Sequence, residues 1–209
     1  MVYAREIAEG GLKIKAIKLS PEKPFTWASG FYMPIYNDNR MFLFYPQYRE
    51  MISEGFLNII QEYKINFDII AGTSTSRIPL ATTLADIEQI PLIYVRDKPK
   101  NHGLRNQIEG IDAEKDLEGK RVLLIEDLIS TGGSSANAVQ AIRNANGICD
   151  YCLSVFNYGF NEAKQIFNGT RQFNKEGDRL NPKCNMLSIL TYDILLQVAK
   201  QTDYINSEQ

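Results

Sequence analysis

Two adjacent acids, Glu126 and Asp127, stand just before a run of small polar residues, Ser130–Ser135. Before the acids comes an apolar run typical of a short buried strand, Val122–Ile125, and after the small residues a helical pattern that Gly147 is expected to end. A strand, a turn rich in Gly, Ser and Thr, and a helix bring backbone N–H groups and a helix N-terminus to one point. Such a point suits a phosphate group.

The acids add a second kind of chemistry at the same point. Carboxylates repel a phosphate, but they accept hydrogen bonds from ribose hydroxyls and suit a hydrated divalent cation. The segment therefore predicts a site for a sugar phosphate. It is neither of the common nucleotide loops, because no Lys follows the glycines and the pattern GxGxxG is absent. The alternative is an ordinary strand-to-helix turn with solvated acids.

A second candidate site is the basic loop Arg96–Gly110, broken by Pro and Gly. Its potential cations are Arg96, Lys98, Lys100, His102 and Arg105. A polar loop with few apolar anchors is expected to move when it is empty. Its charge would attract a dense anion such as pyrophosphate, and its closure would expel water. The alternative is a solvated basic loop.

Two weaker candidates complete the set. The segment Gly72–Pro79 has hydroxyl side chains at a strand end, Thr75 and Ser76 among them, which could donate hydrogen bonds to a second phosphate. The segment Phe25–Arg40 is rich in aromatic residues. These side chains either stack on a planar base or form the core of a small cap.

The order of the elements indicates where these residues meet. Apolar strand patterns occupy residues 68–72, 91–96, 122–125, 152–156 and 186–190, and helical patterns follow Pro46 and cover 78–87 and 192–201. This alternation predicts an α/β fold with a mainly parallel central sheet flanked by helices. Ligands of such sheets bind at the carboxyl ends of the strands, where the loops 72–79, 96–110 and 126–135 begin. The Pro-punctuated first 40 residues are expected to form a small cap beside the sheet.

The composition excludes several classes of protein. The 209 residues are 44% hydrophobic and 23% charged, as in an ordinary globular domain. A formal charge of −2 without a basic stripe argues against a nucleic-acid binder. We find neither a signal-peptide pattern nor a membrane-length apolar run, so no membrane partner and a cytoplasmic location are expected. Cys149 and Cys152 form C-x-x-C, but we expect half-buried strand residues rather than a redox pair or a zinc site.

Four segments together resemble the orotate phosphoribosyltransferases, a branch of the phosphoribosyltransferase family. They read KLSPEKPFTWASGFYMPIYNDNR, IIAGTSTSRIPLA, YVRDKPKNHGLRNQIEG and VLLIEDLISTGGSS, and the resemblance spans roughly residues 10–160. The resemblance implies a single domain over residues 1–209 with the type I phosphoribosyltransferase fold, in which residues 1–40 form most of an N-terminal hood. The last segment is shared by phosphoribosyltransferases in general, whereas the first and third are specific to the orotate branch.

The resemblance also implies an activity. The enzyme would transfer ribose 5-phosphate from 5-phosphoribosyl 1-pyrophosphate (PRPP) to orotate, giving orotidine 5′-monophosphate and pyrophosphate on the way to UMP. Mg²⁺ would be the cofactor, carried by the diphosphate without direct protein ligands. The transition state is expected to resemble an oxocarbenium ion, so that positioning and electrostatics replace a covalent nucleophile. The functional unit would be a homodimer in which the basic loop of each chain reaches into the other chain's site.

Residue roles carry over by position. Arg96 would grip the diphosphate together with Lys100 and His102, the two residues expected to be catalytic, and Thr75 and Ser76 would form a pyrophosphate loop. Glu126 and Asp127 would hold the ribose hydroxyls. The cradle of PRPP's 5′-phosphate would comprise Leu128, Ile129, Ser130, Thr131, Gly132, Gly133 and Ser134. Orotate would contact Ser130, Tyr36 and Asn37.

Some positions depart from the family pattern. Arg77 stands where relatives usually have Gly, and Asp97 replaces a second basic residue found in some branches. Ala28 replaces a Lys of another branch, and the stretch 156–159 lacks an Arg that some relatives place near orotate. The alternatives are a purine or uracil phosphoribosyltransferase, a non-catalytic regulator, and half of a fused UMP-forming protein. A stand-alone enzyme is the expectation, because 209 residues leave no room for a decarboxylase domain.

Overall fold

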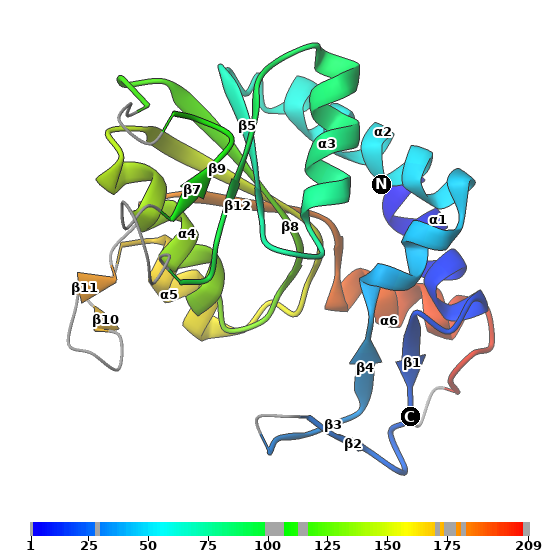
Figure 1. Ribbon diagram of the computed structural model, residues 1–209. Coiled ribbons are helices and arrows are strands. Elements are labelled where there is room, and N and C mark those ends of the chain that lie inside the picture. Colours follow the sequence, from blue (N-terminus) through cyan, green and yellow to red (C-terminus); the bar gives the residue numbers. More distant parts are fainter. Residues whose placement is uncertain are drawn as a thin grey trace.

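The computed structural model describes residues 2–27, 30–98, 107–112, 117–169, 172–173, 179–180 and 183–206. In this part of the chain a six-stranded sheet has the order β12-β9-β8-β5-β6-β7 (Figure 1). Its strands are β5 (Ile69–Thr73), β6 (Leu92–Val95), β7 (Ile108–Glu109), β8 (Arg121–Ile129), β9 (Ile148–Asn157) and β12 (Asn185–Thr191). Neighbouring strands are parallel except β7, which is antiparallel to β6. The predicted α/β fold with a mainly parallel sheet is confirmed.

Helices cover both faces of this sheet. They are α1 (Val2–Lys13), α2 (Pro46–Glu62), α3 (Ile78–Glu88), α4 (Gly133–Asn144), α5 (Asn161–Phe167) and α6 (Tyr192–Gln201), with a 3₁₀ helix η1 (Asn39–Phe44). Apolar side chains of α1, α2, α3 and α6 belong to one hydrophobic cluster, and those of α4 and α5 to another. Two layers of helices therefore enclose the sheet.

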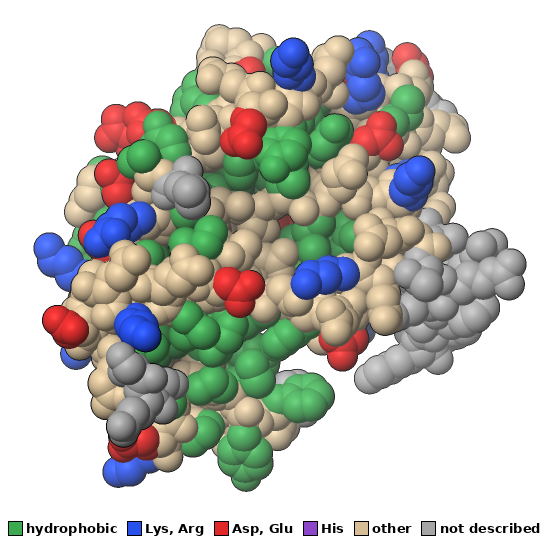
Figure 2. Space-filling view, turned by 180° about the vertical axis from the view of Figure 1, so that it is seen from behind, with side chains coloured by type: hydrophobic (Ala, Val, Ile, Leu, Met, Phe, Trp, Pro, Cys, Tyr) green, Lys and Arg blue, Asp and Glu red, His purple; other side chains and the backbone are tan. Residues whose placement is uncertain are grey.

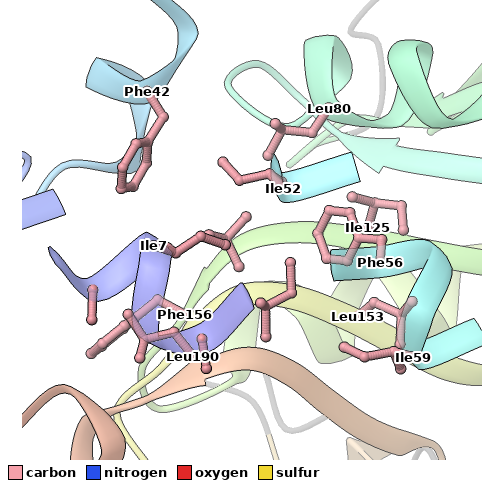
Figure 3. Close-up of a cluster of buried hydrophobic side chains, with 14 of the residues drawn as sticks. Ile7, Phe42, Ile52, Phe56, Ile59, Leu80, Ile125, Leu153, Phe156 and Leu190 are labelled. Carbon is pink, nitrogen blue, oxygen red and sulfur yellow. The ribbon is translucent and has the colours of Figure 1, made fainter. Parts of the chain in front are cut away.

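The central strands serve both clusters. Leu123 of β8 packs in the first cluster and its neighbour Leu124 in the second, because successive side chains of a strand point to opposite faces. Figure 3 shows Phe56 of α2 beside Ile125 in the first cluster. A strand buried on both faces needs apolar residues at consecutive positions, and this is the apolar run seen in the sequence.

The structure corrects two expectations at the strands. Strand β8 continues to Ile129, so that Glu126 and Asp127 lie within the strand instead of following it. The reason is that β9 continues to pair with β8 up to Ile129, beyond the apolar run. Cys149 and Cys152 lie in β9 as expected, but both are fully buried and not half-buried.

The first 40 residues contribute a helix and two antiparallel strand pairs, one nested within the other in the chain, which are called the hairpins below. Helix α1 packs against α6, α2 and β12. Strand β1 (Ile17–Leu19) pairs with β4 (Ile35–Asn37), and β2 (Phe25–Thr26) pairs with β3 (Tyr32–Met33). The two hairpins project below the helices in Figure 1, and Figure 2 shows hydrophobic side chains exposed on the same lower part of the molecule.

Trp27 ties the hairpins to the sheet. Its ring centroid lies 4.9 Å from that of Tyr158, just beyond β9, and its Nε1 donates a hydrogen bond to the Ile35 carbonyl at 2.9 Å. At least this aromatic side chain serves packing within the fold. A short hairpin of β10 (Gln172–Phe173) and β11 (Arg179–Leu180) lies apart from the main sheet. Among the described residues, no helix combines the length and apolarity that a membrane span requires.

Candidate functional site

The two acids lie where β8 extends beyond its neighbour. Pairing between β8 and β5 ends with Gly72 opposite Ile125, whereas pairing between β8 and β9 continues to Ile129. On the β5 side, the end of β8 therefore meets the turn between β5 and α3. Glu126 is fully buried and Asp127 is 9% exposed. Two neighbouring carboxyl groups thus lie at the carboxyl edge of the sheet, where an α/β fold binds its ligands.

Hydroxyl groups at the end of β5 and in the turn that follows it bind both carboxylates. Thr73 Oγ1 donates to Glu126 Oε2 at 3.0 Å, and Ser76 Oγ donates to Asp127 Oδ2 at 3.0 Å. The peptide bond between Ser74 and Thr75 in this turn is cis. Buried carboxylates need such donors, because a buried charge without hydrogen bonds is strongly unfavourable.

Arg77, from the same turn, forms ion pairs with both acids. Its Nε lies 2.9 Å from Glu126 Oε2 and 2.8 Å from Asp127 Oδ1. These contacts are short but poorly directed, since neither Arg77 Nε nor Asp127 Oδ1 has an aligned hydrogen bond within the described part of the chain. At Nε the guanidinium therefore compensates the two charges mainly by proximity.

Burial dominates the electrostatics of Glu126. Loss of solvent raises the pKa of its carboxyl to about 7, although the charge of Arg77 and the hydroxyl groups of Ser135 and Thr73 oppose this change. Burial also acts to lower the pKa of Arg77, but the two carboxylates outweigh it and the pKa is raised overall. Arg77 is thus charged, while Glu126 gains or loses a proton near neutral pH.

The turn after β8 ends in an open helix N-terminus. Gly132 precedes α4 in a left-handed conformation (φ 83°), and no side chain caps the helix there. The first N–H groups of a helix have no partner within it, and they attract anions. A Cβ atom on Gly132 would lie 3.2 Å from Cα and Cβ of Ala163 in α5, so α4 begins in close contact with α5.

A cleft of about 470 Å³ opens beside these groups, a volume that suits a small-molecule ligand. It is lined by Thr73, Arg77, Val95, Arg96, Asp97, Ser134, Asn137 and Ala138. Arg96 follows β6, and its side chain forms an ion pair of 3.4 Å with Glu109 of β7. The cleft thus joins the β5–α3 turn, the start of the basic loop and the first turn of α4, as the loop positions at the sheet edge predict.

The hairpins also reach this site. Asn39, at the start of η1, donates a hydrogen bond from Nδ2 to the Asp127 carbonyl at 2.5 Å. Just before it, β4 contains Tyr36, which is 41% exposed, and Asn37. Both polar atoms of the Asn37 amide are buried without a hydrogen bond to any described residue. The polar end of β4 is therefore held beside the acids.

The structure brings several of the predicted site residues together. Ser76 contacts Asp127, and Arg96 and Ser134 line the cleft. Lys100 and His102 lie outside the described residues. Thr73 lies in the predicted hydroxyl segment 72–79, but neither Thr73 nor Asn39 was predicted as a partner of the acids. Thr73 stands at the recognisable end of a buried strand, whereas no local pattern marks Asn39.

Comparison with known proteins identifies the class. Residues 46–151 match the family described as "Phosphoribosyl transferase domain". This match agrees with the fold and with the arrangement of acids, turn and helix. The chain is therefore a member of the phosphoribosyltransferases.

The particular branch follows from individual relatives. The orotate phosphoribosyltransferase of Cytophaga hutchinsonii is 38% identical over 209 residues, covering 100% of this chain and 92% of that protein. The Streptococcus gordonii enzyme of the same name is 41% identical over 208 residues, with the same coverage. A crystal structure of orotate phosphoribosyltransferase from Aeropyrum pernix has a TM-score of 0.72 at 22% identity, covering 96% of this chain and 99% of that one. The chain belongs to the orotate phosphoribosyltransferase family.

The start of α4 yields a stability prediction. Gly132→Ala should destabilise the protein by about 1–3 kcal/mol, because its Cβ is strained at positive φ and crowds Ala163. Gly133→Ala is the matched control: it lies in the helix, and within 4 Å its Cβ would meet nothing beyond the neighbouring residues and backbone of its own helix. Urea unfolding measures both variants. Equal stability of the two would contradict this account of the turn.

Glu126 yields a pH prediction. The pKa of Glu126 is ordinarily 4.5 and is raised to about 7 in the folded protein. Between these two pH values Glu126 is deprotonated in the unfolded chain and keeps its proton in the folded chain. The folded state then binds more protons, so the stability due to Glu126 is complete below pH 4.5 and is lost as pH rises to about 7. The loss amounts to about 3 kcal/mol, and Glu126→Gln should lack it.

Denaturant unfolding between pH 5 and pH 8 checks this prediction. The stability of Glu126→Gln relative to wild type should rise across that range. Glu50→Gln, on an exposed position of α2, controls for the change in net charge. If Glu126→Gln and wild type follow parallel curves, burial does not hold the proton on Glu126.

Proposed function

We propose that this protein transfers ribose 5-phosphate from PRPP to orotate, releasing pyrophosphate and forming orotidine 5′-monophosphate in the synthesis of UMP. Membership of the orotate phosphoribosyltransferase family supports this activity. The structural observation that carries it is the position of Glu126 and Asp127 beside the open N-terminus of α4 and a cleft that accommodates a small ligand. One edge of the sheet thus offers acceptors for ribose hydroxyls and donors for phosphate.

The site residues divide the substrate among them in this proposal. The N–H groups of Ser130–Ser134 bind the 5′-phosphate, and Glu126 and Asp127 accept hydrogen bonds from the ribose hydroxyls. Arg96, Thr75 and Ser76 face the diphosphate. Because pyrophosphate is a stable leaving group once its charge is balanced, positioning and charge stabilisation suffice for catalysis.

The donor set fits a hydrated cation beside the diphosphate. Glu126 Oε1 and Asp127 Oδ1 have no aligned hydrogen bond among the described residues, so they can accept hydrogen bonds from water molecules on Mg²⁺. In this proposal Glu126 and Asp127 would hold the water shell of a Mg²⁺ ion carried by the diphosphate, and that ion would supply neutralisation of the diphosphate charge. Glu126 and Asp127 themselves orient the ribose and are not direct ligands of the metal.

The hairpins supply the base site in this proposal. Tyr36, Asn37 and Ser130 face orotate, and the amide of Asn37 offers a donor and an acceptor that have no partner among the described residues. A planar ring with alternating N–H and C=O groups matches such an amide. In this proposal residues 1–209 form a single domain, and residues 1–40 form most of its N-terminal hood.

The remaining roles concern the basic loop. We propose that Lys100 and His102 bind the diphosphate in the site of a partner subunit, which makes the homodimer the functional unit. The flanks of the loop support only a place for the loop near a diphosphate: Arg96 N donates to the Gln107 carbonyl at 2.8 Å, and Arg96 and Asp97 line the cleft. Both flanks of the loop therefore begin at the site.

We also propose that the protein is cytoplasmic.

A spectrophotometric assay tests the activity. Orotate should disappear in the presence of PRPP and Mg²⁺, whereas uracil and adenine should not be consumed. Asp127→Asn should lower kcat/KM at least about tenfold, because a charged acceptor for a ribose hydroxyl is lost. Turnover of uracil or adenine without turnover of orotate would refute the assignment.

Subunit mixing tests the shared site. Lys100→Ala and Asp127→Asn proteins, each impaired alone, should together recover up to about a quarter of wild-type activity, because half of the chains form mixed dimers with one intact site. Native mass spectrometry verifies the exchange, and two copies of Lys100→Ala carrying different tags serve as the control. No recovery despite proven exchange would place each loop in its own subunit's site.

A further inference from the structure

Arg77 lies between the two acids and the cleft. Its Nε touches a carboxylate oxygen of Glu126 and one of Asp127, and its side chain also lines the cleft. The Arg77 side chain is 23% exposed, whereas that of Glu126 is 0% exposed. The guanidinium therefore covers the buried acids on the side from which a ligand would approach.

The carboxylates that would bind ribose are already engaged. Glu126 Oε2 accepts a hydrogen bond from Thr73 and Asp127 Oδ2 accepts one from Ser76. Arg77 contacts Glu126 Oε2 again and also Asp127 Oδ1, and Glu126 Oε1 is buried without a hydrogen bond from any described residue. Two ribose hydroxyls and Arg77 would compete for the same acceptors.

The contacts of Arg77 are of a kind that can be exchanged. The Nε atom is near both acids but is aligned with neither, as far as the described residues show. Its backbone is fixed at the start of α3 (φ −91°, ψ −17°), so a displacement needs only side-chain rotation. The cleft beside it also contains Arg96 and Ser134, and there a second anion would meet the displaced guanidinium.

We propose that Arg77 is an internal cation that occupies the ribose-binding acids in the free protein and moves onto the diphosphate when ribose hydroxyls displace it. This inference rests on the proposed function and adds to it a residue that exchanges one charge partner for another during substrate binding. Arg77 would then weaken ribose binding and strengthen diphosphate binding. A merely structural role would not give opposite effects.

Calorimetric titrations of the full-length protein with two probes, ribose 5-phosphate and pyrophosphate with Mg²⁺, separate these effects. In Arg77→Gln the Kd of pyrophosphate, measured with ribose 5-phosphate present, should rise about tenfold or more, because a charge-assisted contact is lost. The Kd of ribose 5-phosphate should fall, because Arg77 no longer competes with the ribose hydroxyls for Glu126 and Asp127. Arg121→Gln is the matched control: it removes an arginine from the other end of β8 and should change neither Kd.

A measurement on the wild-type protein avoids any loss of folding in the variant. Because ribose 5-phosphate drives Arg77 toward the diphosphate, it should lower the Kd of pyrophosphate, and pyrophosphate should lower that of ribose 5-phosphate by the same factor. Arg77→Lys keeps the charge and should retain part of this coupling, whereas Arg77→Gln should lose it. Thermal unfolding verifies that both variants are folded.

Three results would overturn the exchange: both ligands weakened in Arg77→Gln, neither affected, or pyrophosphate weakened with ribose 5-phosphate unchanged. A different result would refute the proposed function itself: a wild-type protein that binds neither probe and does not consume orotate with PRPP. If the wild-type enzyme is active and Arg77→Gln binds both probes as wild type does, only the inference about Arg77 is refuted.

Discussion

The site depends on the compensation of two buried carboxyl groups at the end of β8. An isolated carboxylate cannot remain ionised in a protein interior, and the raised pKa of Glu126, about 7, shows that burial outweighs its compensation. Donors from Thr73 and Ser76 and the charge of Arg77 all come from the end of β5 and the turn that follows it. The position of that turn relative to β8 is therefore the constraint on which the geometry of the site depends.

The sheet topology fixes this position. Because β5 and β8 are parallel neighbours, the turn after β5 and the end of β8 lie at the same edge, and the earlier end of β5 brings the turn level with the acids. The pairing of β8 with β9 holds the acids in extended backbone up to the phosphate turn. The hydrogen bond from Asn39 to the Asp127 carbonyl then attaches the hairpins to the same strand.

Much of this architecture can be predicted from sequence because it depends on local patterns. The apolar runs gave the order of strands and helices, and helix α6 has the predicted bounds 192–201. The end of β8 was placed too early, because two acids interrupt the apolar run, and only the pairing partner β9 shows that the strand continues. Helix α1 was not predicted, since its burial comes from contacts with α6 and β12, far away in the sequence.

Arg77 illustrates the same limit at the site. The sequence marks it as unusual, but its two partners lie about fifty positions away, and no periodicity connects a turn residue with the end of another strand. Hydrophobic patterns report which face of an element is buried; they do not report which charged groups meet at an edge. Tertiary contacts of this kind follow from the sheet order, so they become visible only once the order is known.

A carboxyl oxygen that has no hydrogen bond in the free protein gives the site a basis for selectivity. Glu126 Oε1 is buried without a hydrogen bond from any described residue, and this has a cost in the free protein. A ligand hydroxyl that donates to Glu126 removes the cost, whereas an analogue without that hydroxyl leaves the acceptor buried and unpaired. Sites built to bind a hydroxyl discriminate strongly against analogues that lack it, for this reason. In the proposed role, the acids thus select a ribose over a deoxyribose. The source of that selection is the free-energy cost of the buried Glu126 oxygen that has no hydrogen bond in the free protein.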